Sequence, residues 1–289
     1  MWTEFSQTLR RLRGQIIGWS IGLGLYGVMM VYFYDTVAQM EEIQQMIESY
    51  PPELMAFFDS VYSIATPAGY LETYYFSLMN LIVGIFAVGA AAKLLAGEEE
   101  RGILDLVLAH PVSRTALFWG RFLGFVAATA IILLVGWLGW AVPSGSAAMD
   151  VTWIELLRPF VTLFVQLVLF GALALLLSMV LPAVRLASML AGTLLVANFL
   201  LMGLANLNED LQAAVEFTPL YYYQGGDAIQ GLEWGWLAAL MGATLVLALG
   251  AWALFQRREI RVGGEHSWRL PNPVTWLRHK GNPTSTRSA

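Results

Sequence analysis

Apolar stretches of about 20 residues recur six times along the chain, separated by shorter polar segments. An α-helix rises 1.5 Å per residue, so a helix of about 20 residues crosses a hydrocarbon core of about 30 Å. The pattern predicts six transmembrane helices within a region from 14 to 256. Their expected ranges are 16–34, 73–96, 122–142, 160–181, 186–207 and 234–255. The expected fold class is therefore an all-α polytopic membrane protein.

Residues 1–13 have the spacing of an amphipathic helix that lies along the membrane surface. Four apolar residues share one face, and polar residues cover the other, which is the pattern of an interfacial helix. The apolar residues are Trp2, Phe5, Leu9 and Leu12. A secretory signal is the alternative, but the apolar run that follows is long for one and ends without a small-residue cleavage site. We therefore expect a retained first span.

The segment 97–114, between the second and third expected spans, is polar but patterned, and we call it the elbow. It begins with the charged run Glu98, Glu99, Glu100 and Arg101. The apolar residues Ile103, Leu104, Val107 and Leu108 then recur at helical spacing, with Asp105 off that stripe. Pro111 should end this helix, because the residue before a proline avoids the α region, and Ser113 can cap the next helix. The alternative is that the charges only keep a loop soluble.

Two other polar segments flank the last span. The segment 208–233 is too short and too polar to cross a membrane, yet it contains Phe217 and the run Tyr221, Tyr222 and Tyr223. It is either part of an aromatic belt at the headgroup level or a short helical hairpin over the outer mouth of a pathway. The segment 257–289 is a basic tail.

The distribution of basic residues predicts which side each segment faces. Fifteen of the 16 Lys and Arg residues lie on the side of both termini and the elbow, and Arg158 is the exception. Basic residues gather in cytoplasmic loops, so both termini and the elbow should face the cytoplasm.

Composition excludes several kinds of chemistry. The chain is 57% hydrophobic and 13% charged, has a mean hydropathy of +0.61 and contains no cysteine. Thiol catalysis, disulfides and Cys-ligated zinc are therefore excluded. No P-loop or H-E-x-x-H motif occurs, so we expect neither a bound nucleotide nor a metal nor any other cofactor on this chain, and no nucleic-acid partner.

The expected spans contain neutral polar residues rather than well-buried charges, so no ion-coupling relay is evident. Asn80, Gln166 and Asn198 are candidates for a transport pathway, together with Phe217, Tyr221 and Tyr222 in the segment 208–233. Hydrogen bonding between helices is the alternative role for the three amides.

The elbow resembles that of ABC type-2 transporter permeases, in which acidic residues precede Arg-Gly-x-Leu-[Glu/Asp]-x-x-Leu and a Pro-[Val/Ile]-Ser-Arg turn. The matching residues are Glu99, Glu100, Arg101, Gly102, Leu104, Asp105, Leu108, Pro111, Val112, Ser113 and Arg114. Residues 218–222 (TPLYY) resemble the Ser-Pro-Phe-x-Tyr stretch before the last span of that family, with Thr218 in place of Ser. Residues 255–260 (FQRREI) resemble its basic exit.

The resemblance implies a non-enzymatic permease in the cell membrane of a prokaryote. Two copies, or one copy and a homologous permease, would form the pathway above a dimer of separate ABC ATPase subunits, which would bind ATP and Mg²⁺. The elbow would dock into the ATPase: Leu104, Val107 and Leu108 would anchor it, and the acidic run with Arg101 would orient it. Such permeases mostly export drugs, lipids, polysaccharides or peptides, and the apolar composition favours a hydrophobic or amphipathic cargo.

The alternative function is a non-transporting membrane scaffold or regulator that docks a cytoplasmic partner through the same elbow. A reading frame for a P-loop ATPase beside this one would favour the exporter, and its absence would favour the scaffold.

Overall fold

The computed structural model describes residues 1–39, 66–100, 102, 113–146, 149–205 and 207–257. Across these ranges every regular element is helical, and six helical stretches are long and apolar enough to cross a membrane. They are α1 (Trp2–Gln39), the run of α4 (Pro67–Leu71), η2 (Glu72–Phe76) and α5 (Ser77–Ala92), and then α8 (Arg114–Ser144), α9 (Trp153–Val180), α10 (Val184–Ala205) and α12 (Trp234–Arg257). The predicted fold class is confirmed.

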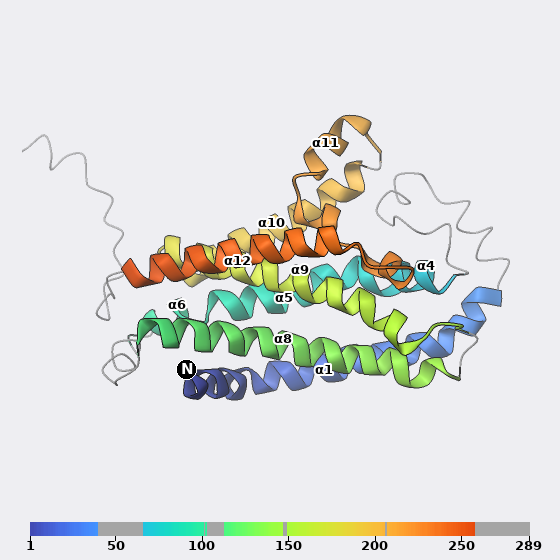
Figure 1. Cartoon of the computed structure of the whole chain (residues 1–289), viewed down its shortest axis with the longest axis horizontal. Helices are drawn as coiled ribbons and strands as arrows, with labels where there is room; N and C mark the ends of the chain where they lie inside the picture. Colours follow the sequence, from blue (N-terminus) through green and yellow to red (C-terminus); the bar gives the residue numbers. More distant parts are fainter. Residues whose placement is uncertain (40–65, 101, 103–112, 147–148, 206, 258–289) are drawn as a thin grey trace, which may run out of the picture.

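The long helices lie side by side, and Figure 1 shows that α1 begins and α12 ends at the same end of the bundle, close to α6 (Ala96–Glu99). We call this the elbow end and the opposite one the far end. Helix α9 is the central element, because it packs against α5, α8, α10 and α12. Helix α1 packs mainly against α8 and touches α5 at few positions.

The second membrane helix begins earlier than its hydropathy predicts. Thr66 has an extended backbone and its side chain accepts a hydrogen bond from the backbone N–H of Gly69, while Pro67 occupies the first turn. A proline there loses no helical hydrogen bond, so the residues that the sequence assigns to a loop instead start a helix. The helix passes through the π-helical turn η2 and ends at Ala92, four residues before the predicted end.

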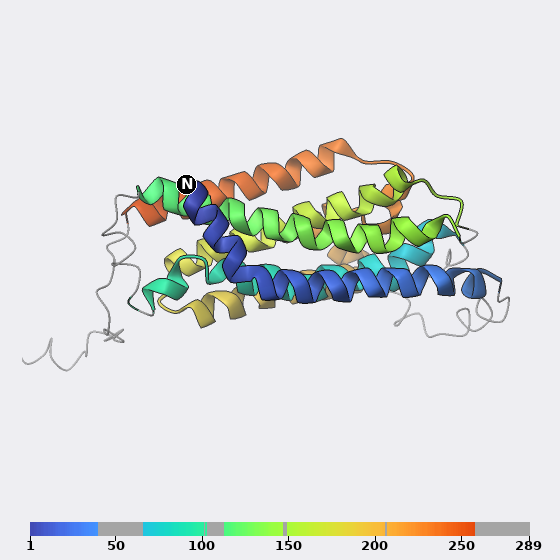
Figure 2. The ribbon, with the colours of Figure 1, turned by 90° about the horizontal axis from the view of Figure 1, so that it is seen from below.

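The expected surface helix 1–13 is not a separate element, because α1 continues from it into the first span. Figure 2 shows the first turns of α1, in dark blue, set at an angle to the rest of the helix. Their buried stripe is Glu4, Thr8 and Leu12, whereas Trp2 is 78% exposed. The apolar face predicted from the sequence is therefore only partly the buried one.

Glycines allow the backbones of α1 and α8 to approach closely along most of their length. A Cβ atom on Gly139 would lie 2.7 Å from the Cα atom of Gly24, and one on Gly27 would lie 2.7 Å from the Trp140 ring. Nearer the elbow end, a Cβ on Gly124 would lie 2.8 Å from the Cβ of Thr8. Small residues permit this kind of contact between membrane helices, so α1 and α8 form a tightly packed pair.

At the far end, the segment between α10 and α12 forms short helices. They are η3 (Glu209–Leu211), α11 (Gln212–Val215), η4 (Pro219–Tyr222) and η5 (Gly225–Ile229). Figure 1 shows α11 standing away from the bundle.

Three polar side chains of the bundle hold this segment by its backbone. Asn198 Oδ1 accepts from Leu220 N at 3.0 Å, Glu72 Oε2 accepts from Gly226 N at 2.5 Å, and Arg158 Nη1 donates to Ile229 O at 2.7 Å. The segment is thus helical and attached to three different spans; whether it caps a pathway stays a prediction.

Replacing Gly139 with alanine should separate α1 from α8. The added methyl group has no room against the backbone of Gly24, and overpacking of this kind costs about 1–3 kcal/mol. We expect the free energy of unfolding of the purified protein to fall by that amount in thermal or denaturant unfolding followed by tryptophan fluorescence. Gly22→Ala is the control, because nothing lies within 4 Å of a Cβ at Gly22. Equal stability of the two variants would show that the glycine contact is not what limits the approach of the helices.

Candidate functional site

The described part of the elbow consists of its two ends. Glu98, Glu99, Glu100 and Gly102 follow α5, and Ser113 and Arg114 begin α8. The other predicted coupling residues lie outside the described residues, and they are Arg101, Leu104, Asp105, Val107, Leu108 and Pro111. The site is therefore built from the elbow's flanks and from the helices that they contact.

The first flank is the short helix α6. Helix α5 ends at Ala92, and Leu94 and Leu95 are buried in the turn that follows. Helix α6 then places Glu98 on its inner side, where 4% of the residue is exposed. Gly102 adopts a left-handed φ of 66°, a conformation that glycine reaches without steric cost.

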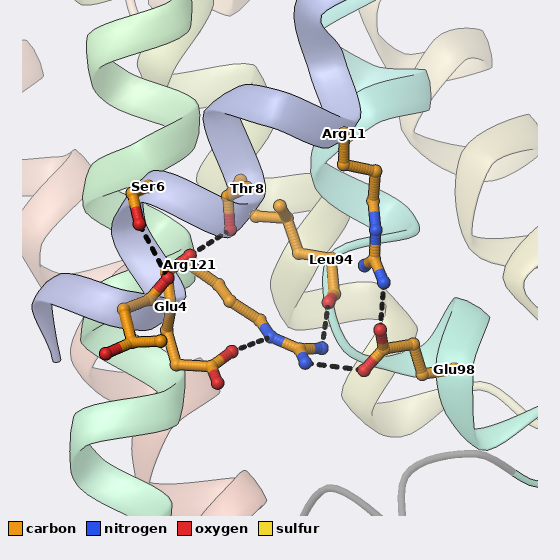
Figure 3. A network of polar contacts seen from close by, with 8 residues as sticks. Glu4, Ser6, Thr8, Arg11, Leu94, Glu98 and Arg121 are labelled. Atoms are coloured by element: carbon orange, nitrogen blue, oxygen red, sulfur yellow. Dashed lines mark hydrogen bonds and ion pairs between the residues drawn. The ribbon is translucent and has the colours of Figure 1, made fainter.

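Glu98 belongs to a cluster of four charged residues, Glu4, Arg11, Glu98 and Arg121, which we call the Arg121 cluster (Figure 3). Arg121 Nη2 lies 2.5 Å from Glu98 Oε2, and Arg121 Nε lies 3.1 Å from Glu4 Oε2. Arg121 Nη1 donates to the backbone oxygen of Leu94 at 2.8 Å. Arg11 reaches Glu98 Oε1 from the other side. One guanidinium therefore joins the start of α1, the turn before α6 and α8.

The cluster combines burial with charge balance. The side chains of Arg121, Glu4 and Glu98 are between 3% and 7% exposed, and that of Arg11 is 45% exposed. Two arginines face two carboxylates, so the cluster as a whole carries no net charge, with Arg11 supplying its positive charge from the half-exposed edge. Removing one partner from such a pair costs several kcal/mol, typically about 3–5, because the other charge stays buried without compensation.

The pKa of Glu98 follows from the same arrangement. Burial raises the pKa of this carboxyl, but the hydrogen bonds and positive charges of Arg11 and Arg121 outweigh burial and hold the pKa below its usual value. A carboxyl with a lowered pKa stabilises the fold above its ordinary pKa, and this contribution is lost as the pH falls through the lowered value.

Glu100 connects the same flank to a different helix. Its Oε1 accepts a hydrogen bond from the backbone N–H of Val184 at 2.7 Å, at the first residue of α10. The first N–H groups of a helix have no partner within it, and the helix dipole favours a negative charge there. Glu100 therefore caps α10 from across the bundle.

The second flank connects α8 to the end of α12. Ser113 accepts a hydrogen bond from Ala116 N, which confirms it as the N-cap of α8. Arg114 Nη1 donates to the backbone oxygens of Phe255 and Gln256, at 3.4 and 3.2 Å. Gln256 Nε2 in turn donates to Thr115 Oγ1 at 2.9 Å. These contacts satisfy carbonyls that the last turn of a helix leaves free.

The carboxylates of the acidic run have different surroundings. Glu98 is buried in the Arg121 cluster, whereas Glu100 is exposed and accepts the hydrogen bond from the first N–H of α10. The predicted role of this run in docking stays a prediction. In the sequence, Glu4 is one of the polar residues opposite the apolar face of residues 1–13, and Arg121 is the basic residue just before the expected third span. Glu4 and Thr8, one helical turn apart, share the buried face of the first turns of α1, and no local sequence pattern marks that face.

The six candidate pathway residues lie in two regions. Asn80 and Gln166 are buried on α5 and α9, and within the described part of the chain both amide atoms of Gln166 and the Oδ1 atom of Asn80 have no hydrogen-bond partner. Asn198 instead holds the backbone of Leu220. Phe217 is 89% exposed, whereas Tyr221 and Tyr222 pack against Trp236 at the start of α12.

An apolar cavity of about 140 Å³ lies between α8 and α9. Its lining includes Leu133, Leu134, Phe160, Val161 and Phe164. A second cavity, of about 410 Å³, lies at the far end, where Asp150, Glu155 and Asp227 contribute carboxylates.

The family model described as ABC-2 family transporter protein matches residues 1–260 of this chain. The match includes all six membrane-spanning stretches and the Arg121 cluster. No curated protein matches the chain.

Glu98→Gln should destabilise the fold at neutral pH and remove part of its acid sensitivity. The neutral amide leaves Arg121 and Arg11 without one of their counter-charges, so we expect a loss of about 3 kcal/mol at pH 7. In the unaltered chain the contribution of Glu98 to the free energy of unfolding is complete at pH 7. It declines once the pH falls below about 4.5, the ordinary pKa of a glutamate, and is lost as the pH passes through the lowered pKa of the folded protein. The difference in unfolding free energy between the two proteins should therefore shrink over that range.

Thermal unfolding between pH 7 and pH 3 measures both effects. Glu216→Gln is the control, because Glu216 is exposed. A gap between Glu98→Gln and the unaltered chain that stays constant down to pH 3 would contradict the lowered pKa.

Proposed function

This chain belongs to the ABC-2 transporter family, and on that basis we propose that it is the membrane subunit of an exporter driven by separate ATPase subunits. Its membership makes it a permease subunit of an ABC transporter, a multi-pass membrane protein of the kind that generally pairs with an ABC ATPase. The direction of transport, the dimer, the cargo and the coupling through the elbow are the parts that we propose.

The observation that carries the proposal is the set of contacts made by the elbow's flanks. Glu98 reaches α1 and α8, Glu100 reaches α10, and Arg114 reaches α12. Because α6 continues from α5, a displacement of the elbow acts on five of the six membrane-spanning stretches at once. This is what a coupling element requires when the chain carries no nucleotide-binding motif of its own.

The orientation follows from the charges. The elbow end carries both the N-terminus and the end of α12, and the sequence places 15 of its 16 basic residues on this side. On the positive-inside rule, we propose that the elbow faces the cytoplasm, where an ATPase can reach it, and we propose a prokaryotic cell from the resemblance of the sequence to type-2 permeases.

The proposed cargo is hydrophobic or amphipathic and passes between two copies of the chain, or between this chain and a homologous permease. The support is the apolar cavity between α8 and α9 and the aromatic cluster of Tyr221, Tyr222 and Trp236 at the far end. Gln166, near the middle of α9, would meet polar groups of the cargo when the bundle opens.

Replacing both Leu104 and Leu108 with aspartate should separate the permease from its ATPase. The two leucines are the proposed apolar anchor, and loss of such an anchor costs at least about 2 kcal/mol, or more than tenfold in affinity. We expect loss of co-purified ATPase and of permease-dependent ATP hydrolysis, while membrane insertion is retained. Leu207→Asp, beyond the far-end terminus of α10, controls for the added charge. Unchanged ATP hydrolysis in the double variant, purified with its ATPase, would contradict the role of the elbow.

Gln166→Met should stabilise the protein and impair transport. The substitution removes a buried amide that has no partner among the described residues, a deficit of about 1–3 kcal/mol, with little change in side-chain length. We expect a higher unfolding temperature and reduced ATP-dependent efflux of hydrophobic fluorescent dyes from cells that contain the complex. A lower unfolding temperature would show that Gln166 is already paired in the resting bundle and does not await a cargo.

A further inference from the structure

The six membrane-spanning stretches divide into two groups by their packing. Helices α1 and α8 form a pair held by the glycine contacts of Gly24, Gly124 and Gly139. The other stretches gather around α9, which packs against α5, α10 and α12. Helix α8 of the pair also contacts α9, and Arg114 joins it to the end of α12. The apolar cavity between α8 and α9 lies on the boundary between the two groups.

Helix α6 and its C-cap residue Glu100 contact both groups through two carboxylates that lie two residues apart. Glu98 is bound by Arg121 of α8 and Arg11 of α1, on the side of the pair. Glu100 is bound by the first N–H of α10, on the side of the α9 group. The elbow therefore begins at a point from which it can move one group against the other.

The Arg121 cluster is not needed to hold α1 on α8. Next to the cluster, a Cβ on Gly120 would lie 2.8 Å from the Cβ of Glu4, and Gly124 contacts Thr8 in the same way, so close packing already fixes this pair. Buried ion pairs are also poor stabilisers compared with apolar side chains of similar volume. What the charges add is the connection to α6: Arg121 holds Glu98 by its side chain and Leu94 by its backbone oxygen.

We propose that Arg121 is a positioning residue that passes a displacement of the elbow to α1 and α8, which then move as one unit against α10. The proposal rests on the function proposed above. It adds the contacts through which a conformational change of the ATPase would reach the first and third membrane-spanning helices. Arginine suits this position because its planar fork can hold Glu4, Glu98 and the Leu94 carbonyl at the same time, which the single ammonium of lysine cannot.

The absence of cysteine from the chain makes a direct distance measurement possible. Spin labels on cysteines at Ile17 of α1 and Met189 of α10, both more than half exposed, report the distance between the groups. Labels at Ile17 and Leu123 of α8 report the distance within the pair. Labelled chains are diluted with unlabelled ones, bound to the ATPase subunit, and compared without nucleotide and after trapping with ATP and vanadate.

We expect trapping to shift the Ile17–Met189 distance and to leave the Ile17–Leu123 distance unchanged. In Arg121→Lys the shift should be lost, while ATPase binding and the Ile17–Leu123 distance are retained. The control variant Glu216→Gln, which removes an exposed carboxylate, should keep the shift. A residue with only a structural role would alter the distance within the pair instead.

Every other outcome counts against the proposal. If Arg121→Lys alters the Ile17–Leu123 distance, the measurement is repeated with Glu98→Gln. A changed Ile17–Leu123 distance in both variants would show that the cluster only maintains the fold. A shift that survives in either folded variant, or no shift in the unaltered chain with the ATPase bound, would overturn the proposal and leave the proposed function standing. Failure of the unaltered chain to bind any ABC ATPase would overturn both this proposal and the proposed function.

Discussion

A guanidinium group buried at the end of a membrane bundle constrains everything around it. Arg121 is 3% exposed, and its charge is tolerable there only because two carboxylates and a backbone oxygen lie within reach. Those partners come from the first turn of α1, from α6 and from the turn that leads into α6. Compensating this charge therefore joins the beginning of the elbow to the N-terminal segment, which close packing already holds on α8.

Close packing against α8 accounts for the buried face of the first turns of α1. Glu4 and Thr8 sit on α8 where Gly120 and Gly124 provide space, so the stripe that faces the protein is polar and small rather than apolar. Trp2, on the apolar face predicted to lie along the membrane surface, is left exposed. An interfacial environment accommodates an exposed tryptophan, because its ring is apolar and its N–H can remain hydrated. At this end of the helix, the space over the two glycines sets the buried face.

The sequence predicted the number of spans and the cap at Ser113, because both depend on local features: run length, and one side chain beside its own helix. It did not predict the Arg121 cluster, because Glu4 and Arg121 lie 117 residues apart and Arg11 and Glu98 lie 87 apart, so no local pattern connects them. The second span was expected to begin at residue 73, but its helix begins at Pro67. Proline and glycine are typical of turns, and only the hydrogen bond of the Thr66 side chain shows that here they start a helix. The central residues of the elbow, such as Leu104, are still known from their sequence pattern alone.

The contrast between the two kinds of buried polar residue bears on how such a bundle moves. The charged groups of the cluster are compensated, so separating them is costly and α6 stays attached to α1 and α8. The amides of Gln166 and Asn80, in the middle of the bundle, have unpartnered atoms in the described structure. Because each such group costs about 1–3 kcal/mol in the packed state, separating the helices around it recovers that free energy once water or a cargo can reach it. The contacts at the elbow end therefore resist separation, whereas the helices around the buried amides cost less free energy to separate. A bundle that opens in response to a displacement of the elbow requires this distribution of stability.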